Sequence, residues 1–454
     1  MLLDVLVLAA GKGTRMRSDL PKVLHCLAGK PLLGHVFTSV QALDNAAINT
    51  IVGHGKELIQ EAFANQPVNW IDQTSQLGTA HAVLQAIPAL RDDAKVLIVY
   101  GDVPLIKSRT LEKMLTGVDD NAMALLTVEL SNPTGYGRIL RNEEGQVTGI
   151  IEQKDAAPEQ LKLTEVNTGV MAMTAADLKT WLPKIDNNNA QQEYYLTDVI
   201  SLARAAGRRI NTYAPAAVEE VEGVNSRAQL VTLERYYQQQ VANQLLDNGV
   251  TVVDPNRFDC RGDLSTGQDV VIDINCIFEG TNQLGNSVNI GPNCVIKDAI
   301  IGDNVIIKAN TVIEGPVTLE ADVQVGPFAR LRPHTMLAVG AKVGNFVETK
   351  KAQIGPGSKI SHLSYIGDAV LGSEVNVGAG TITCNYDGVN KHLTEIDDGA
   401  FIGSNTSLVA PVSVGKNATV GAGSTISRDV PDESLAIARG KQRTLDTWKR
   451  PEKK

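Results

Sequence analysis

A glycine-rich turn near the start of the sequence carries the residue types that bind phosphate. Val5 to Leu8 form an apolar run typical of a buried parallel strand. Small residues follow it at once, namely Ala9, Ala10, Gly11 and Gly13. They let backbone N–H groups approach an anion closely, and Arg15, Arg17 and Lys22 add three cations within eight residues. The stretch therefore predicts a phosphate-binding loop at the end of a strand.

Two other phosphate-binding patterns fit this turn poorly. The dinucleotide-binding fingerprint needs a third glycine where Met16 stands, and the Gly-Lys-Ser/Thr of the P-loop is absent. A plain turn with solvated basic residues is the alternative that has no function.

Two further polar segments follow strand-like runs in the first half. Gln73 lies in Asp72–His81, a turn that enters a helix, and its amide suits the edge of a nucleobase. Asp102 lies in Val99–Pro104, directly after an apolar run, where a carboxylate can bind Mg²⁺ or simply cap a turn. Because ligands of parallel sheets bind beyond the carboxyl ends of strands, we expect these segments to meet the phosphate loop.

The elements that must position these segments alternate between strand and helix. We expect strands at Val5–Leu8, Thr50–Val52, Val96–Tyr100 and Ala124–Val128, and helices at Pro31–Leu43 and Thr79–Leu90. This alternation predicts an α/β domain with a mainly parallel sheet.

Length and composition narrow the class of protein. The 454 residues exceed one ordinary core, and the net charge of −9 argues against nucleic acid as the main partner. No run is long enough to span a membrane, and the apolar start lacks the basic region of a signal peptide. The five cysteines are scattered without a CxxC pair, so we expect buried thiols in a reducing cytoplasm.

The second half contains a repeat. Aliphatic residues recur every six positions from Ile272 to Val343, with a step of five at Ile301, and again from Ile354 to Ile426. Such hexads predict a β-helix whose coils stack one aliphatic residue per face. We expect Val343–Ala352 to break the hexad with charge and Cys384–Glu395 to leave the coil as a loop. Before the repeat, residues 226–249 show helical spacing and predict one long linker helix.

Polar and cationic residues gather around these interruptions. They are Arg330, Arg332, Lys350, Lys351, His362, Tyr365, Asn376, Asn385 and Tyr386. A histidine near its ordinary pKa can take a proton from an amine at neutral pH, so His362 is a candidate general base. A structural histidine and a metal ligand are the alternatives, but the histidines are too scattered to favour zinc.

The whole chain resembles a known family. Leu8-Ala-Ala-Gly-Lys-Gly-Thr-Arg-Met16, with the later Leu20-Pro-Lys22, is similar to the signature of sugar nucleotidyltransferases. The segments 135–138, 149–154, 165–169, 193–198 and 222–225 match, in order and spacing, the bacterial bifunctional uridyltransferase/acetyltransferases that make UDP-N-acetylglucosamine. Ser361–Asp368 matches the motif that contains the general base of that family.

The resemblance implies an architecture and an activity. Residues 1–225 would form a Rossmann-like uridyltransferase domain, 226–249 a linker helix, and 250–454 a left-handed parallel β-helix with a C-terminal tail. The second domain would acetylate glucosamine-1-phosphate with acetyl-CoA, and the first would join the product to UTP and release pyrophosphate. The family is a cytoplasmic homotrimer that needs Mg²⁺ and supplies precursors of peptidoglycan and lipopolysaccharide.

The resemblance also assigns residues of the first site. Arg15 and Lys22 would hold the triphosphate and stabilise the transition state, and Asp102 and Asn225 would carry Mg²⁺. Nucleotide contacts would come from Leu8, Ala9, Ala10, Gly11, Gly13, Lys22, Gln73, Gly78, Thr79, Tyr100, Gly101 and Asp102. Contacts with the sugar phosphate would come from Gly137, Glu152, Asn167, Thr168 and Asn225.

In the second site the resemblance makes His362 the base that deprotonates the amino group, with Glu348 as its orienting partner. Glucosamine-1-phosphate would be bound by Arg332, Glu348, Lys350, Tyr365, Asn376, Asn385 and Tyr386. Acetyl-CoA would be bound by Ala379, Ser404, Ala422 and Arg439, and a backbone N–H near Ala379 can stabilise the oxyanion.

Two alternatives stay open on the sequence. One is a nucleotidyltransferase with a single activity, whose β-helix serves only to oligomerise. The other is a regulatory or scaffolding relative that keeps the fold but not the chemistry.

Overall fold

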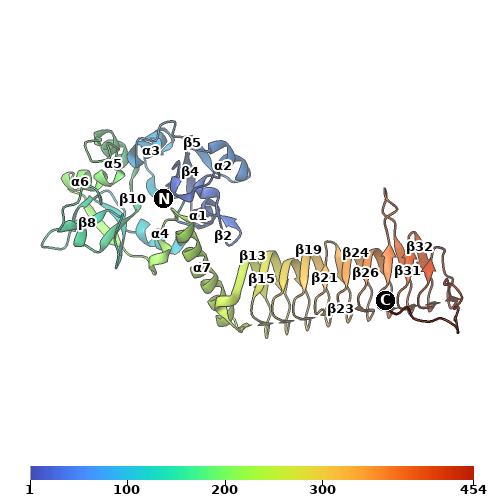
Figure 1. Cartoon of the computed structure of the whole chain (residues 1–454). Helices are drawn as coiled ribbons and strands as arrows, with labels where there is room; N and C mark the ends of the chain where they lie inside the picture. Colours follow the sequence, from blue (N-terminus) through green and yellow to red (C-terminus); the bar gives the residue numbers. More distant parts are fainter. Residues whose placement is uncertain (1, 454) are drawn as a thin grey trace. The chain divides into compact units, whose positions relative to one another are not determined.

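The computed structural model describes residues 2–453, and the chain divides into two compact units between Tyr237 and Gln238. The first unit contains a nine-stranded mixed sheet and the second contains stacked coils of short parallel strands (Figure 1). Among the described residues no helix combines the length and apolarity that a bilayer crossing requires.

The sheet of the first unit has the strand order β11-β7-β10-β6-β1-β4-β5, with β8 and β9 attached beside β10. Neighbouring strands are parallel except where β10 pairs with β6, β7 and β8, and where β8 pairs with β9. The strands are β1 (Leu3–Ala9), β4 (Ala46–Val52), β5 (Asn69–Asp72), β6 (Lys95–Tyr100), β7 (Ala122–Glu129), β8 (Arg138–Arg141), β9 (Val147–Ile151), β10 (Glu165–Thr174) and β11 (Arg209–Tyr213). A separate hairpin pairs β2 (Cys26–Leu27) with β3 (Lys30–Pro31).

Both faces of this sheet are covered, because alternate residues of β1 enter two different cores. Val5 and Val7 belong to one hydrophobic cluster, whereas Leu6 and Leu8 belong to the other. The covering helices are α1 (Leu32–Gln41), α2 (Lys56–Ala62), α3 (Thr79–Ala86), α4 (Ser108–Leu115), α5 (Ala175–Trp181) and α6 (Val199–Ala205). The α/β class and its mainly parallel sheet are therefore confirmed, and all four expected strands are present.

One long helix, α7 (Arg227–Asp247), contributes to both units. Leu233 belongs to a cluster of the first unit, and Ala242 and Leu245 belong to the core of the second. Gly249 follows the helix with a φ of +87°, the left-handed conformation that commonly ends helices.

The second unit is built on two long parallel sheets. One runs through β12 (Thr251–Val252), β14 (Val271–Ile272), β16 (Asn289–Ile290), β18 (Ile306–Ile307), β20 (Gln324–Val325), β23 (Lys342–Asn345), β25 (Lys359–His362), β27 (Asn376–Val377), β30 (Phe401–Ile402), β33 (Thr419–Val420) and β35 (Leu435–Ala436). The other runs through β13 (Phe258–Thr266), β15 (Cys276–Leu284), β17 (Val295–Ile301), β19 (Val312–Leu319), β21 (Arg330–Leu331), β24 (Glu348–Ile354), β26 (Tyr365–Leu371), β28 (Ile382–Cys384), β31 (Ser407–Val409) and β34 (Thr425–Ile426). Three more strands attach to the second sheet, β22 (Thr335–Leu337), β29 (Thr394–Ile396) and β32 (Val412–Val414).

The hexad predicts the core of this unit. The expected inward residues from Ile272 to Ile426 are all at most 5% exposed. The expected break at Val343–Ala352 is wrong, because Thr349 takes the inward position there and is fully buried. Its hydroxyl lies 3.0 Å from that of Thr335, also buried, so the coil continues with a satisfied polar pair inside.

The second expected interruption is a loop that projects from the stack between β28 and β29 (Figure 1). Tyr386 and Lys391 form a short bridge within it. The expectation of buried thiols is met only in part. Cys260, Cys276 and Cys294 are buried, but Cys384 is half-buried and Cys26 is exposed.

Candidate functional site

The glycine-rich turn follows the carboxyl end of β1 and leads into two short 3-10 helices, η1 (Thr14–Met16) and η2 (Lys22–Leu24). Gly13 has a φ of +59°, and a Cβ placed on it would lie 2.6 Å from Cβ of Lys22. Glycine is required at this position, because a side chain would both strain the backbone and displace Lys22. Arg15 lies on η1 and is exposed, and it does not line the cavity described below.

The ammonium group of Lys22 lies between two oxygen donors from distant parts of the chain. It pairs with the carboxylate of Asp102, just beyond β6, and donates a hydrogen bond of 3.0 Å to Oδ1 of Asn225, just before α7. A carboxylate and an amide oxygen that already share one cation fit Mg²⁺, which commonly takes one or two protein ligands and completes its shell with water and phosphate. The described residues contain no group of three or more His, Cys, Asp or Glu side chains that could hold a metal by themselves.

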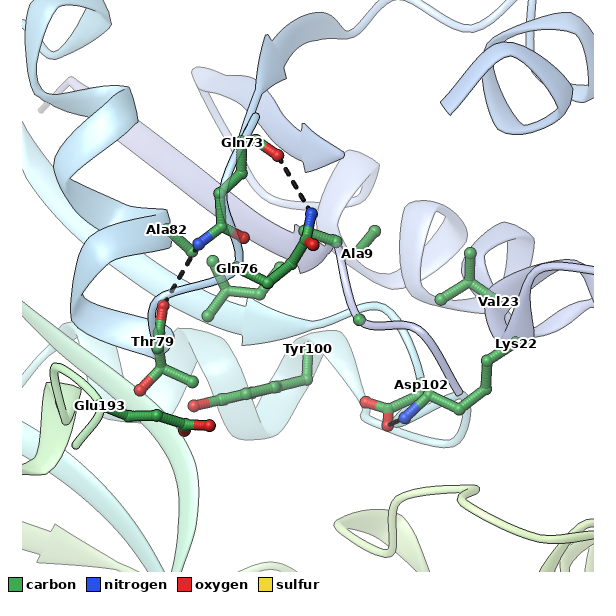
Figure 2. Close-up of a pocket in the computed structure, with 14 residues that line it drawn as sticks. Ala9, Lys22, Val23, Gln73, Gln76, Thr79, Ala82, Tyr100, Asp102 and Glu193 are labelled. Carbon is green, nitrogen blue, oxygen red and sulfur yellow. Dashed lines mark hydrogen bonds and ion pairs between the residues drawn. The ribbon is translucent and has the colours of Figure 1, made fainter. Parts of the chain in front are cut away.

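A cavity of about 240 Å³ opens beside the ion pair of Lys22 and Asp102. Of the expected nucleotide contacts, it is lined by Leu8, Ala9, Ala10, Gly11, Lys22, Gln73, Gly78, Thr79, Tyr100 and Asp102. Gly13 and Gly101 support it from outside the lining. In Figure 2, Gln73 and Thr79 lie at one side of the cavity, and Lys22 and Asp102 lie at the other.

Four lining residues were not expected, namely Val23, Gln76, Ala82 and Glu193. Gln76 and Glu193 lie inside polar segments that the sequence singles out, so their position could have been predicted. Val23 and Ala82 are apolar residues of ordinary helices, and nothing in their sequence context marks them.

Gln73 is held in place before any ligand arrives. Its side chain is 4% exposed, and Nε2 lies 3.3 Å from the carbonyl oxygen of Gly78 and 3.1 Å from Nδ1 of His81. Gly78 has a φ of +120°, and a Cβ there would lie 2.5 Å from the carbonyl oxygen of Tyr194. Two tightly packed turns therefore fix one wall of the cavity.

The expected contacts with the sugar phosphate gather around a bulge in β10. The register against β7 shifts between Asn167 and Met171, which brings Gly169 against the ring of Tyr100. The hydroxyl group of Thr168 donates a hydrogen bond of 2.8 Å to the carbonyl oxygen of Leu126. These residues do not line the cavity itself, but Tyr100 joins their bulge to it.

Glu152 is the titratable residue of this group. Burial raises the pKa of its carboxyl group, although a hydrogen bond of 3.2 Å from the hydroxyl of Thr197 opposes this shift. Gly137 is close, since a Cβ there would lie 3.4 Å from Oε1 of Glu152. Tyr100 keeps its proton, because burial and the nearby carboxylates of Asp102 and Glu152 raise the pKa of its hydroxyl.

In the second unit, a cluster of cations lies on the sheet that contains β24 and β26. Lys350 lies beside Lys391 of the projecting loop, and this second ammonium group, with Arg332, lowers the pKa of Lys350. Arg332 also donates a 2.9 Å bond to Glu348. Its Nε is buried without a partner in the described residues. Three cations around one point form a site for an anion such as phosphate. The sequence missed Lys391, because it lies in an irregular loop.

Asn385 completes this side of the cluster, since its amide donates a 2.5 Å bond to the carboxylate of Asp368. Tyr386 is exposed and bonds within the loop to the carbonyl oxygen of Gly388. Asn376 does not join them, because it lies in β27 of the other sheet, whereas Arg332, Glu348, Lys350 and Tyr365 follow or belong to strands of the sheet with β24.

His362 is exposed at the end of β25, and its position corrects one expectation. Its Nδ1 lies 2.5 Å from Oδ1 of Asn345, and the two residues pair in register across β23 and β25. The expected orienting partner, Glu348, is instead engaged by Arg332. Strand register places an amide beside the ring, whereas Glu348 lies beyond the following corner.

The expected acetyl-CoA contacts share one position in successive coils. Val377, Ile402 and Val420 pair in register, and the second residue after each is Ala379, Ser404 and Ala422. The corners are tied together by bonds from Asn405 N to the oxygen of Ala379, 2.7 Å, and from Gly423 N to that of Ser404, 2.8 Å. Arg439 reaches back to the carbonyl oxygen of Ala422, 2.7 Å away. Because Ile360 pairs with Val377, His362 occupies the same position one coil earlier.

Comparisons with known proteins agree with both halves of this description. The MobA-like NTP transferase domain matches residues 5–157. The bacterial transferase hexapeptide family, a model of six repeats, matches residues 283–315, 298–333 and 394–428.

Relatives match over the full chain. A protein of Marinobacter nauticus named Bifunctional protein GlmU is 58% identical over 451 residues, which are 99% of each chain. The protein of the same name from Cellvibrio japonicus is 59% identical and covers 100% of both chains. The chain belongs to the GlmU family. A third GlmU relative, from Idiomarina loihiensis, is 57% identical over 100% of this chain and 99% of its own.

Membership explains why one chain carries two unlike sites. GlmU relatives are named as bifunctional proteins, and this chain is likewise a bifunctional transferase, with an NTP transferase fold followed by a left-handed β-helix of hexapeptide repeats.

Proposed function

We propose that the cavity of the first unit transfers a uridylyl group from UTP to N-acetylglucosamine-1-phosphate. We further propose that the second unit makes that sugar by acetylating glucosamine-1-phosphate with acetyl-CoA. The observation that carries the first assignment is the polarity of the cavity, which has amide and backbone groups at the Gln73 side and a cation between carboxylate and amide oxygens at the Lys22 side (Figure 2). A nucleobase fits the first side and a triphosphate fits the second.

Uridylyl transfer on this cavity needs position and charge more than a base. A phosphate oxygen of the sugar attacks the α-phosphorus of UTP, the bond to the β-phosphate oxygen breaks, and pyrophosphate leaves. The attacking phosphate is already an anion, so no side chain must remove a proton from it. Lys22 faces the cavity and stabilises charge on the phosphates, and exposed Arg15 is free to reach the leaving pyrophosphate. Mg²⁺ held by Asp102 and Asn225 would supply further neutralisation of phosphate charge.

The sugar would bind beside the bulge of β10. Gly137 leaves room for the sugar there, and Gly101 lets the turn after β6 approach the loop. Polar groups come from the carboxylate of Glu152, the amide of Asn167 and the hydroxyl of Thr168. The carboxylate of Glu152 accepts a bond from Thr197 and would accept further bonds from sugar hydroxyls.

Acetyl transfer would take place beside His362. The Arg332, Lys350 and Lys391 cluster binds the phosphate of glucosamine-1-phosphate, and Tyr365, Asn376, Asn385 and Tyr386 would bind the sugar. The amino group of the sugar attacks the carbonyl carbon of the thioester while His362 takes a proton from it, and the thiolate of CoA leaves. The column of Ala379, Ser404 and Ala422 offers a surface of small residues along which the coenzyme can lie, with Arg439 at its end.

We also propose a homotrimer formed through the β-helix. Three apolar residues, Phe328, Phe346 and Leu363, lie at successive corners in the left-handed region, at 49%, 55% and 60% exposure. The rings of Phe328 and Phe346 stack 5.3 Å apart. Corners of this kind favour glycine or asparagine, so exposed apolar residues there indicate a covered surface. Contact with another copy would also bring Asn376 of one subunit to the cluster of the next.

Two separable assays test the assignment. Supplied with glucosamine-1-phosphate and acetyl-CoA, the His362→Asn variant should release no CoA, yet it should form pyrophosphate from UTP and N-acetylglucosamine-1-phosphate. Asp102→Ala should do the reverse. His334→Asn, which changes another histidine of the β-helix, serves as the matched control. Two folded variants that each lose both activities would overturn the two-site proposal. CoA release by His362→Asn would remove His362 from the chemistry.

A further inference from the structure

The proposed role of His362 as the general base does not explain why its ring contacts Asn345. Oδ1 of Asn345 lies 2.5 Å from Nδ1 of His362. An amide oxygen can only accept, so Nδ1 carries the hydrogen and the proton-accepting lone pair is on Nε2. No carboxylate of the described chain lies within ion-pair distance of this ring, whereas the ring of His392 has Asp387 at 2.8 Å.

We propose that Asn345 is a positioning residue that fixes the tautomer and the orientation of His362 for acetyl transfer. This inference rests on the proposed role of His362 as the general base. It assigns to an uncharged amide the task that a carboxylate performs in many other histidine bases.

Backbone geometry holds the two side chains together. Asn345 and His362 are register partners at the ends of β23 and β25, so their Cα atoms are neighbours in adjacent coils. Just beyond them, the N–H of Leu363 donates a 3.0 Å bond to the carbonyl oxygen of Asn345. Ser364 then bonds through its hydroxyl to the carbonyl oxygen of His362, 2.9 Å away. The corner therefore cannot turn without breaking several bonds.

The neutral partner suits the chemistry. A carboxylate on Nδ1 would favour the protonated ring and would raise the pKa of the histidine. An amide can orient the ring without placing a negative charge beside it.

The test compares Asn345→Ala and Asn345→Asp with the wild type in the CoA-release assay across a range of pH. Asn345→Ala should lower kcat about tenfold or more at unchanged KM for both substrates, which is part of the roughly 10²–10⁴-fold that a positioned general base contributes. Asn345→Asp keeps an acceptor of the same shape, so it should recover most of the rate at high pH. Its acid limb should move up by about one pH unit or more.

Asn286→Ala is the matched control, because the amide of Asn286 also bonds to a side chain 17 residues further on, donating 3.1 Å to the carboxylate of Asp303 at a corner with no proposed role in acetyl transfer. It should match the wild type. Thermal unfolding monitors the fold of each variant, and Asn345→Asp, which preserves shape, decides the question if Asn345→Ala proves unstable.

Wild-type kcat in Asn345→Ala, or an unshifted acid limb in Asn345→Asp, would overturn the inference. His362→Asn separates this failure from failure of the proposed function. If His362→Asn is inactive while Asn345→Ala is fully active, only the positioning role is wrong. If His362→Asn retains acetyl transfer, the base assignment fails, and this inference fails with it.

Discussion

Lys22 and Asp102 form an ion pair across 80 residues of sequence, at the point where the phosphate loop meets the end of β6. The same ammonium group is bonded to Asn225. A lysine thus occupies the space between the two side chains proposed to bind Mg²⁺. If Asp102 and Asn225 held Mg²⁺, the ammonium group of Lys22 would lose these two partners and could pair with the phosphates of the nucleotide instead.

Removal of divalent metal should therefore separate the two activities. Chelation with EDTA should abolish pyrophosphate formation, because the phosphates lose their neutralising ion, and should leave CoA release unchanged. Added Mg²⁺ should restore the first activity in the wild type but not in Asp102→Ala. Loss of both activities on chelation would contradict a metal site confined to the first unit.

Gly13→Ala should disable uridylyl transfer through Lys22. The new methyl group would collide with Cβ of Lys22 and would force it away from Asp102. Gly145→Ala is the control, since Gly145 has a φ of +78° but no atom lies within 4 Å of the position that its new methyl group would take. Both variants should lose about 1–2 kcal/mol of stability from the left-handed backbone, measured by urea unfolding. Only Gly13→Ala should lose pyrophosphate formation by more than that instability explains.

Lys391→Ala should weaken binding of glucosamine-1-phosphate. One charge-assisted bond to phosphate contributes about 1.5–3 kcal/mol, so KM for this substrate should rise roughly tenfold or more. The neighbouring ammonium group of Lys391 and the guanidinium group of Arg332 lower the pKa of Lys350. In the variant that pKa rises, and the alkaline loss of phosphate binding should move to higher pH. Lys416→Ala, at another exposed lysine of the β-helix, should change neither quantity.

Glu152→Gln should stabilise the protein while it impairs uridylyl transfer. Burial raises the pKa of Glu152 in the folded state, so at pH 7 its charged form opposes folding. The amide removes this cost, and its oxygen still accepts from Thr197. The gain in Tm should be full well above the raised pKa. It should vanish below about pH 4.3, where the carboxyl group is protonated in both states. A gain in Tm that is equal at all pH values would show that charge is not the cause.

Much of the fold could be predicted because few folds are compatible with the repeat of the second half and the alternation of strands and helices in the first. An aliphatic residue at every sixth position, sustained over many repeats, is typical of a coil with three faces. The failure at Thr349 is instructive, because polarity alone predicted a break there. A threonine can replace an aliphatic residue when a second buried hydroxyl, here that of Thr335, lies within hydrogen-bond distance.

The candidate sites were predictable where residues follow the carboxyl ends of parallel strands. Gln73 and Asp102 lie just beyond β5 and β6, and the loop that leads to Lys22 follows β1, so the sheet brings the three together. Asn345 and Lys391 could not be found in this way. The importance of Asn345 comes from stacking on a residue 17 positions later, and Lys391 is placed by an irregular loop.

Equivalent positions in successive coils of the β-helix lie at fixed distances from one another. His362, Ala379, Ser404 and Ala422 lie in four successive coils, and neighbouring strands are spaced about 4.8 Å apart. The reach from the base to the last of them is thus three steps, or roughly 14 Å. This length is set by counting coils, so it cannot drift with loop motion. The length of the surface proposed to bind the coenzyme can therefore change only by whole coils, in steps of about 4.8 Å.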